Sequence, residues 1–243
     1  LVYTYLPTSA DKTYFLPPAL TNGNVHGIIV LNVYNERLLR LLAETQIPKV
    51  FLDTSSLVAP DELNGDLLLM ESRTSVRRIT CHLLEQGRTL PGFIGDISYA
   101  QSNRERYEGF CQALTDAGKK VDSSLCLTTP LGIDTYREEI DTFLSSLSRM
   151  PDAFVCASDY VACILMQNKE KRGLRVPEDV AVSGFDNNTE DLLAEHLTTV
   201  QVFNEELGAR LALQILYRIK YPNTPHEITY LGTNVLYRDS TGD

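Results

Sequence analysis

Polar side chains follow the short apolar runs of this sequence, and their types suit them to binding a small molecule. The residues directly after these runs are Asn32, Asp53, Glu71, Asp96, Ser158, Asp159 and Asp186. If the runs are parallel strands, their carboxyl ends meet at one edge of a sheet, which is where ligands bind in such folds. A single residue of this kind can equally be a loop residue or a helix cap. Taken together, the set favours a site lined with hydrogen-bond acceptors.

One cation stands out beside these acceptors. Ser102 and Arg106 are four residues apart in a predicted helix and therefore share one face. The guanidinium of Arg106 offers a planar fork of donors that can span two neighbouring hydroxyl groups or a carboxylate. Together with an acceptor such as Asp186, it suits a neutral polyhydroxylated ligand. The alternative is a solvated arginine that pairs with Glu105 or Glu108 on a surface helix.

Aromatic residues near the predicted strand ends could supply the apolar face that a sugar ring prefers. The candidates are Phe185, Tyr99 and Tyr160. Aromatic residues in such positions more often belong to the core, and this alternative stays open.

The elements that must position these residues alternate between strand and helix along the chain. Apolar runs predict strands over 28–31, 50–52, 67–70, 93–95, 125–127, 153–156 and 180–182, with two more in 227–238. Helical spacing of apolar residues predicts helices over 35–46, 72–86, 102–118, from 134, 159–172 and 205–219. Short links between alternating elements indicate parallel sheets covered by helices. About nine strands are too many for one small sheet, so we expect two doubly wound subdomains of an α/β protein.

Composition excludes several classes of protein. The 243 residues carry a formal net charge of −10, which disfavours direct binding of this chain to a nucleic-acid backbone. No apolar run approaches the roughly 18 residues of a membrane-spanning helix. The five cysteines include no C-x-x-C pair and lie in apolar segments, so we expect reduced core thiols in a cytoplasmic protein.

Signatures of catalysis are absent from the sequence. It contains no G-x-S-x-G, H-E-x-x-H, P-loop or G-x-G-x-x-G motif. The four histidines are scattered, and adjacent Cys81 and His82 point to different faces of a predicted helix. We therefore expect no enzyme activity, no metal site and no cofactor.

Four blocks of the sequence form a recognisable set, namely 82–87 with 93–95, Ser102–Phe110 with its R-x-x-G-F segment, 157–159 with 173–187, and 197–200 with the closing 237–241. Together they resemble the effector-binding domain of the lactose-repressor/galactose-repressor (LacI/GalR) family of bacterial transcription regulators. Their order and spacing are specific, and they span about residues 65–243. The resemblance implies a periplasmic-binding-protein-like fold, in which two α/β subdomains are joined by three crossings and a ligand cleft lies between them.

The resemblance also implies a division of the chain and a set of ligand contacts. The predicted N-terminal subdomain is 1–97 plus 201–225, and the C-terminal one is 98–200 plus 226–243. Arg106 and Asp186 match the main polar effector contacts, facing each other across the gap between the lobes. Ser102 and Ser158 match secondary contacts, Glu71 stands where the family usually has Asp, and Asn32 is loosely placed.

The implied partners are a small-molecule effector, operator DNA and a second copy of the chain. Effectors in the family are mostly sugars and sometimes purines, so we expect a mono- or disaccharide. The DNA-binding helix-turn-helix headpiece is expected outside these residues, and the chain resembles the family only from after its first strand and helix. Two segments depart from the family pattern, namely Gly87-Arg88 and 71–75. A solute-binding protein of a sugar transporter and a carbohydrate-active enzyme remain as alternatives.

Overall fold

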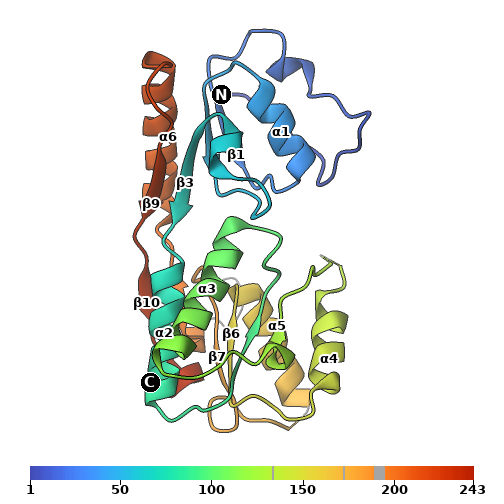
Figure 1. Cartoon of the computed structure of the whole chain (residues 1–243), viewed down its shortest axis with the longest axis vertical. Coiled ribbons are helices and arrows are strands. Elements are labelled where there is room, and N and C mark those ends of the chain that lie inside the picture. The colour runs from blue at the N-terminus through green and yellow to red at the C-terminus, as the bar shows by residue number, and fades with distance from the viewer. Residues whose placement is uncertain (133, 172, 189–194) are drawn as a thin grey trace. The chain divides into compact units, whose positions relative to one another are not determined.

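A computed structural model describes residues 1–132, 134–171, 173–188 and 195–243, and the chain forms two compact units (Figure 1). The first unit comprises Leu1–Met70, Tyr99–Ser102 and Phe203–Gly232. The second unit comprises Glu71–Ser98, Asn103–Val202 and Thr233–Asp243. The chain passes from one unit to the other after Met70, Val202 and Gly232, and residues 99–102 form a short return to the first unit.

This division differs from the one predicted from the sequence at residues 71–97, 99–102, 201–202 and 226–232, and packing explains the two longest of these stretches. Residues 71–97 belong to the second unit because helix α2 (Arg73–Glu85) is held by helix α3 (Gln101–Asp116). Arg77 Nη2 of α2 lies 2.6 Å from Asp116 Oδ2, and Arg73 pairs with Glu108. Residues 226–232 belong to the first unit because strand β9 (Ile228–Leu231) pairs with strand β3 (Asp66–Met70).

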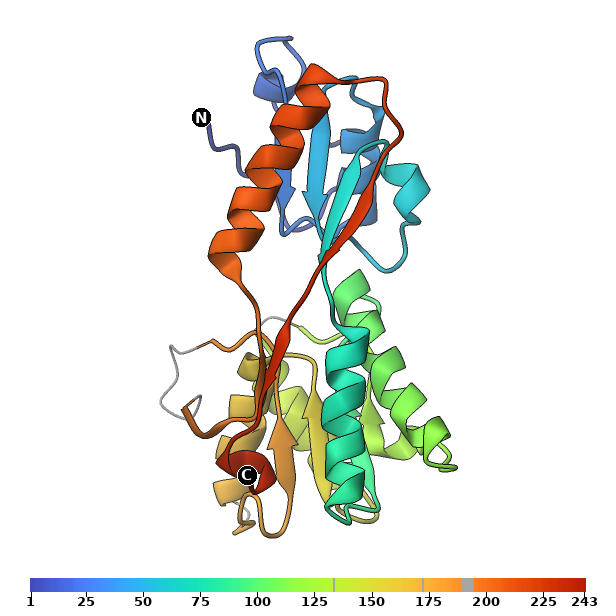
Figure 2. The same cartoon turned by 90° about the vertical axis from the view of Figure 1, so that its left-hand side faces the viewer.

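The first unit is built on a parallel four-stranded sheet in the order β1-β2-β3-β9 (Figure 2). Its other strands are β1 (Ile28–Leu31) and β2 (Lys49–Leu52). Helix α1 (Glu36–Glu44) buries Leu39 and Leu42 against Val30, Phe51 and Leu67. Two short 3-10 helices, Pro18–Leu20 and Pro60–Leu63, complete this layer.

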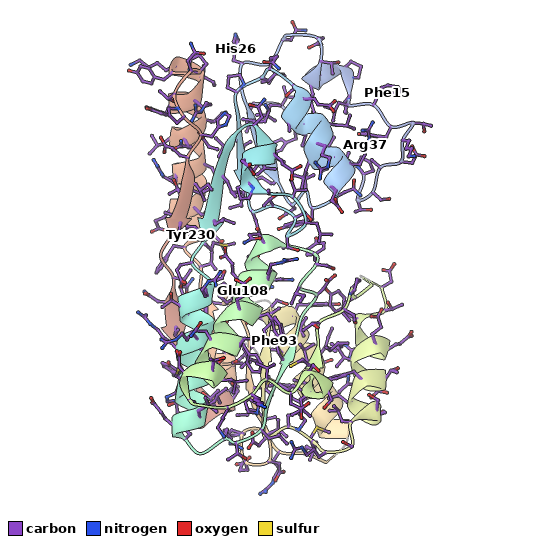
Figure 3. All side chains as sticks on the ribbon, in the orientation of Figure 1. Phe15, His26, Arg37, Phe93, Glu108 and Tyr230 are labelled. Atoms are coloured by element: carbon purple, nitrogen blue, oxygen red, sulfur yellow. The ribbon has the colours of Figure 1, made fainter. Side chains whose placement is uncertain are left out.

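Helix α6 (Asn204–Lys220) buries Leu207, Leu211 and Ile215 toward the first unit's core. The opposite face of α6 exposes Leu213, Leu216 and Tyr217. Tyr230 of β9 is likewise exposed, and its side chain is labelled in Figure 3.

The second unit holds a parallel sheet in the order β5-β4-β6-β7 and an antiparallel pair, β8 with β10. The strands are β4 (Pro91–Ile94), β5 (Cys126–Leu127), β6 (Ala153–Cys156), β7 (Ala181–Ser183), β8 (Thr199–Gln201) and β10 (Asn234–Leu236). Single bridges, Ser183 to Thr198 and Asp186 to Gln201, join β8 to the end of β7. Short 3-10 helices cover Ser123–Leu125 and Asp239–Thr241.

Helices cover both faces of the second unit's sheet. The crossovers β4-α3-β5 and β6-α5-β7 run in opposite directions along the sheet, so their right-handed connections place α3 and α5 on opposite faces. Helix α4 (Tyr136–Ser146) packs beside α5 (Asp159–Lys171), where Ile140 and Leu144 join a cluster with Leu165. Figure 1 shows α2 with α3 and α4 with α5 as two pairs. The fold class predicted from the sequence is therefore confirmed.

Two glycines in helices give a matched test of this packing. A Cβ atom at Gly109 of α3 would lie 2.2 Å from the Arg73 carbonyl oxygen of α2, whereas one at Gly208 of α6 would meet nothing within 4 Å. We expect Gly109→Ala to lower the free energy of unfolding by about 1–3 kcal/mol because α2 must move away. Gly208→Ala should raise it by roughly 0.5–1 kcal/mol through lower backbone entropy in the unfolded chain. Denaturant unfolding followed by circular dichroism measures both, and equal stability of the two variants would contradict the prediction.

The cysteines and the helices bear on two further expectations. None of the five cysteines forms a disulfide. Cys156 and Cys163 are buried, as the sequence predicted for all five. Cys81, Cys111 and Cys126 are only partly buried, so the prediction that they are core residues is wrong.

Within the described residues, none of the helices has both the length and the apolar character needed to cross a membrane.

Candidate functional site

The candidate site lies at the carboxyl edge of the second unit's parallel sheet. Strands β4, β6 and β7 are parallel neighbours, so the segments after Ile94, Cys156 and Ser183 emerge at the same edge. Helix α3 belongs to the same unit from Asn103 onward. It contributes Arg106 to this edge, where the guanidinium meets the segments that follow β6 and β7.

Arg106 is the central cation of the site. Its side chain is 5% exposed, and its guanidinium carbon lies 3.7 Å from the centroid of the Phe185 ring. Nη1 donates to the carbonyl oxygen of Ala157, and Nη2 lies 3.5 Å from Asp186 Oδ1. Nη1 also lies 3.5 Å from Asn103 Oδ1. The contact with the Phe185 ring and the hydrogen bond to Ala157 hold the guanidinium of Arg106 in one position.

Asp186 is the acid of the site, and its backbone is unusual. Its φ of 106° lies in a region that residues other than glycine seldom adopt, and its amide N–H donates to Val200 O at 3.1 Å. Removal from water raises the pKa of Asp186, and the positive charge of Arg106 acts in the opposite direction. The carboxylate is nevertheless 44% exposed, so it can exchange its long contact with Arg106 for contacts to a ligand.

The relation between these two residues corrects part of the sequence-based hypothesis. That hypothesis placed Arg106 and Asp186 on opposite sides of a gap between two lobes. Both residues instead belong to the second unit, where they form an ion pair. The two groups come within 3.5 Å of each other inside this one unit, because α3 and the segments after β6 and β7 pack together there.

Phe185 does not have the predicted role of a stacking surface for a sugar. It is completely buried beneath the guanidinium of Arg106, so a ligand cannot reach its ring. The exposed aromatic candidates are Tyr99 in the first unit and Tyr160 at the start of α5. The rings of Tyr99 and Tyr34 have centroids 4.4 Å apart within the first unit.

Ser158 and Glu71 are helix caps in this structure. Ser158 Oγ accepts from the amide of Val161 at 3.3 Å at the start of α5. The Glu71 carboxylate accepts from the amides of Thr74 and Ser75 at 2.5 and 3.1 Å, at the start of α2. These hydrogen bonds satisfy amide groups that a helix leaves unpaired at its first turn. Ser158 directly follows Ala157, whose carbonyl oxygen accepts from Arg106, so it lies beside the site, whereas Glu71 lies at the start of α2.

Ser102 and Asn32 lie in the first unit. Ser102 is inside α3, which begins at Gln101, one residue before the start predicted from the sequence. Its hydroxyl donates to Asp53 Oδ2 at 2.6 Å, and its amide lies 3.3 Å from Asp53 Oδ1. Asn32 follows β1 with a φ of 55° and is exposed. These residues form a second polar edge, at the carboxyl ends of β1 and β2.

Sequence reasoning missed two features of the site. The carbonyl of Ala157 accepts from Arg106, and no side-chain pattern announces a backbone acceptor. Asp159 was one of the strand-end residues, but the sequence did not single it out. It is buried and accepts from Thr199 Oγ1 and the Asn188 amide at 2.6 and 2.7 Å. Burial raises its pKa to about 6.

The described residues contain no group of three or more His, Cys, Asp or Glu side chains that could hold a metal ion.

A cavity of about 510 Å³ lies at the opposite edge of the second unit's sheet, where the strands begin. Its lining includes Leu114, Leu125, Lys119 and Arg149, so it is separate from Arg106 and Asp186.

The residues of this site lie within a stretch that matches a known protein family. The model of the periplasmic binding protein-like domain matches residues 80–241, more than half of the chain. The chain belongs to this family. The matched stretch includes Arg106, Ser158 and Asp186 but not Asn32 or Glu71.

Individual relatives are regulators of transcription. The chain is 27% identical over 216 residues to the HTH-type transcriptional repressor PurR of Glaesserella parasuis, which covers 88% of this chain and 62% of that protein. It is 31% identical over 170 residues to the HTH-type transcriptional regulator DegA of Bacillus subtilis, covering 69% and 48% respectively. The chain thus spans less than two thirds of the length of these two curated relatives.

A solved structure of a regulator bound to a sugar has the same fold. It is the complex of the transcriptional regulator CelR with cellobiose. The two structures match with a TM-score of 0.81 and 27% sequence identity, and the match covers 91% of this chain and 68% of the CelR chain. With the family match and the two regulators, this likeness confirms the resemblance to LacI/GalR effector-binding domains and the periplasmic-binding-protein-like fold.

Proposed function

We propose that this chain is the effector-binding part of a sugar-responsive bacterial transcription regulator, most plainly a repressor, and that its ligand is a mono- or disaccharide. The observation that carries the proposal is the pairing of Arg106, fixed on Phe185, with the exposed carboxylate of Asp186. An arginine fork donates to ligand hydroxyls while a carboxylate accepts from them, which is the arrangement that a neutral polyol requires. CelR, a relative of the same fold, is a regulator that has been solved with cellobiose.

The ion pair is arranged so that a ligand can enter it at little cost. At 3.5 Å the contact between Arg106 Nη2 and Asp186 Oδ1 is long for a charge-assisted hydrogen bond. A ligand hydroxyl that accepts from Arg106 Nη2 and donates to the exposed Asp186 carboxylate would replace this one long contact with two shorter hydrogen bonds. A saccharide that binds one conformational state of the protein better than another shifts the population toward that state, and this is how it would change the affinity for DNA.

The remaining partners are proposals of the same kind. The regulator would bind operator DNA through a headpiece outside these 243 residues, because the chain itself carries a net charge of −10. It would act in the cytoplasm as a homodimer. The absence of enzyme activity is also proposed, and the relatives that are regulators support it. A solute-binding protein of a sugar transporter is the weaker alternative, since the matching relatives regulate transcription.

A ligand screen tests the proposal. Cellobiose, glucose, ribose and the purine base hypoxanthine are each added to the purified chain, and melting temperature and calorimetric titration are recorded. A ligand at one hundred times its Kd adds about 2.7 kcal/mol of stability, which raises Tm by roughly 5–10 °C in a protein of this size. We expect at least one saccharide to do so. A response to the purine alone, or to no member of the panel, would overturn the saccharide assignment.

A further inference from the structure

The loop that carries Asp186 adopts a conformation that needs support. Asp186 and Asn187 have φ angles of 106° and 51°, both in the left-handed half of the backbone map. Residues other than glycine are strained in such regions and persist there only when the surroundings hold them in place. The loop over 184–188 must therefore be held by contacts with neighbouring elements of the second unit.

Asp159, the first residue of α5, supplies those contacts from one side. Its amide N–H donates to the carbonyl oxygen of Phe185 at 2.8 Å. Its Oδ2 accepts from the amide of Asn188 at 2.7 Å, so Asp159 is bonded to the residues on both sides of Asp186 and Asn187. The close fit extends to Gly184, where a Cβ atom would lie 2.2 Å from Asp159 Oδ1.

The other oxygen of Asp159 closes a relay through β8. Thr199 Oγ1 donates to Asp159 Oδ1 at 2.6 Å and accepts from the amide of Asn187 at 3.2 Å. Because one hydroxyl both donates and accepts, each hydrogen bond of this relay strengthens the other. The Asn187 side chain is held in turn by Gln201 Oε1 at 2.6 Å and Arg238 Nη2 at 2.8 Å.

We propose that Asp159 is a positioning residue for effector binding, whose ionised carboxylate holds the 184–188 loop so that Asp186 meets Arg106, and that saccharide affinity therefore depends on its charge. This inference rests on the proposed function. Asp159 itself is 2% exposed and acts through the loop, so it is not a ligand contact.

The charge of Asp159 changes in an accessible pH range. Burial raises its pKa to about 6, the hydrogen bonds from Thr199 and Asn188 oppose this rise, and the negative charge of Asp186 adds to it. Arg238 is the cation whose charge lowers this pKa. Acidification from pH 7.5 to 5.5 protonates Asp159 and removes acceptor capacity from one of its oxygens.

Affinity and stability then respond to acid in opposite directions. We expect saccharide affinity to fall several-fold between pH 7.5 and 5.5. The pKa of Asp159 in the folded chain lies above the ordinary aspartate value of 3.8, so its contribution to folding stability is complete below that value and is lost as pH rises through about 6. A loss of affinity at pH 5.5 is therefore not explained by unfolding through this residue.

The test compares Asp159→Asn with Asp152→Asn. Asp152 also accepts two backbone amides, from Thr89 and Leu90 at 2.6 and 3.0 Å, but it lies at the opposite edge of the sheet. Calorimetric titration with cellobiose, or with whichever saccharide of the screen binds, is run at pH 7.5 and 5.5. We expect Asp159→Asn to weaken binding about tenfold at pH 7.5 and to lose most of the pH dependence, leaving only the part due to Asp186. Asp152→Asn should keep the wild-type affinity and its pH profile.

The variant Thr199→Val and amide hydrogen exchange at Asn188 test the role of Asp159 independently. Thr199→Val removes one donor to Asp159, so the pH at which affinity falls should move upward. Amide hydrogen exchange at Asn188 should quicken in Asp159→Asn, and this needs no ligand. Wild-type affinity and pH profile in Asp159→Asn would overturn the positioning role while leaving the saccharide proposal intact. Failure of the wild-type chain to bind any saccharide would overturn both.

Discussion

Arg106→Ala should weaken saccharide binding by at least 100-fold. The variant removes both Nη donors, and each hydrogen bond from a charged group contributes roughly 1.5–3 kcal/mol. It also leaves Asp186 without the cation that lowers its pKa, so that the carboxyl group becomes easier to protonate and a poorer acceptor. Calorimetric titration at pH 7.5 measures the loss. Affinity within twofold of the wild type would show that Arg106 does not contact the ligand.

Two controls separate binding from folding in this experiment. Arg137→Ala removes an exposed arginine from α4 in the same unit and should leave affinity unchanged. Arg106→Lys keeps the charge but loses the planar fork, so it should restore only part of the affinity. Arg106 is buried and bonded to Ala157, so the melting temperature of each variant must be recorded beside its affinity.

Most of the strands could be predicted from the sequence because they rest on local signals, and Arg106 and Asp186 could be singled out as candidates for the same reason. Apolar runs such as 67–70 and 153–156 become buried parallel strands wherever both faces of a sheet are covered. Arg106 and Asp186 were selected by residue type and by their position relative to these elements. The structure brings them within 3.5 Å of each other.

The details that failed depend on tertiary contacts. Strand β8 was not predicted because its three residues carry no periodic pattern and are held by β10. Ser102 was expected beside Arg106 as a secondary contact, but its hydroxyl donates to Asp53, which is 49 positions away in the sequence. Phe185 looks like a stacking residue in the sequence, and only the position of Arg106 above it shows that the ring is covered. The unit to which residues 71–97 belong is likewise decided by the packing of α2 on α3.

Arg218→Met should destabilise the first unit by about 3–5 kcal/mol, the usual cost of removing one partner from a buried ion pair. Arg218 Nε and Nη2 lie 3.0 and 2.5 Å from the two carboxylate oxygens of Asp66, and both side chains are 2% exposed. Asp66 also accepts from Gln214 Nε2 and the Glu227 amide. The arginine further donates to the carbonyl oxygens of Thr224 and Pro225, which fixes the link from α6 to β9.

The pH dependence of unfolding shows whether Asp66 is the buried charge that loses its partner in Arg218→Met. Hydrogen bonds from Arg218, Gln214 and Glu227 lower the pKa of Asp66 in spite of burial. A lowered pKa means that this pair stabilises the folded state above about pH 4 and that the contribution is lost as pH falls further. In Arg218→Met the pKa of Asp66 should rise, so the stability difference from the wild type should shrink in acid.

A paired substitution tests whether the cost comes from the isolated charge. Asp66→Leu combined with Arg218→Met removes both ions and should recover much of the stability lost in the single variant, because no buried charge remains without a partner. The chain contains no tryptophan, so unfolding is followed by circular dichroism, with amide hydrogen exchange of β3 and β9 to assign the loss to the first unit. If the double variant is less stable than the single one, the pair stabilises the unit through its hydrogen bonds to the 224–227 link, and the charge argument is wrong.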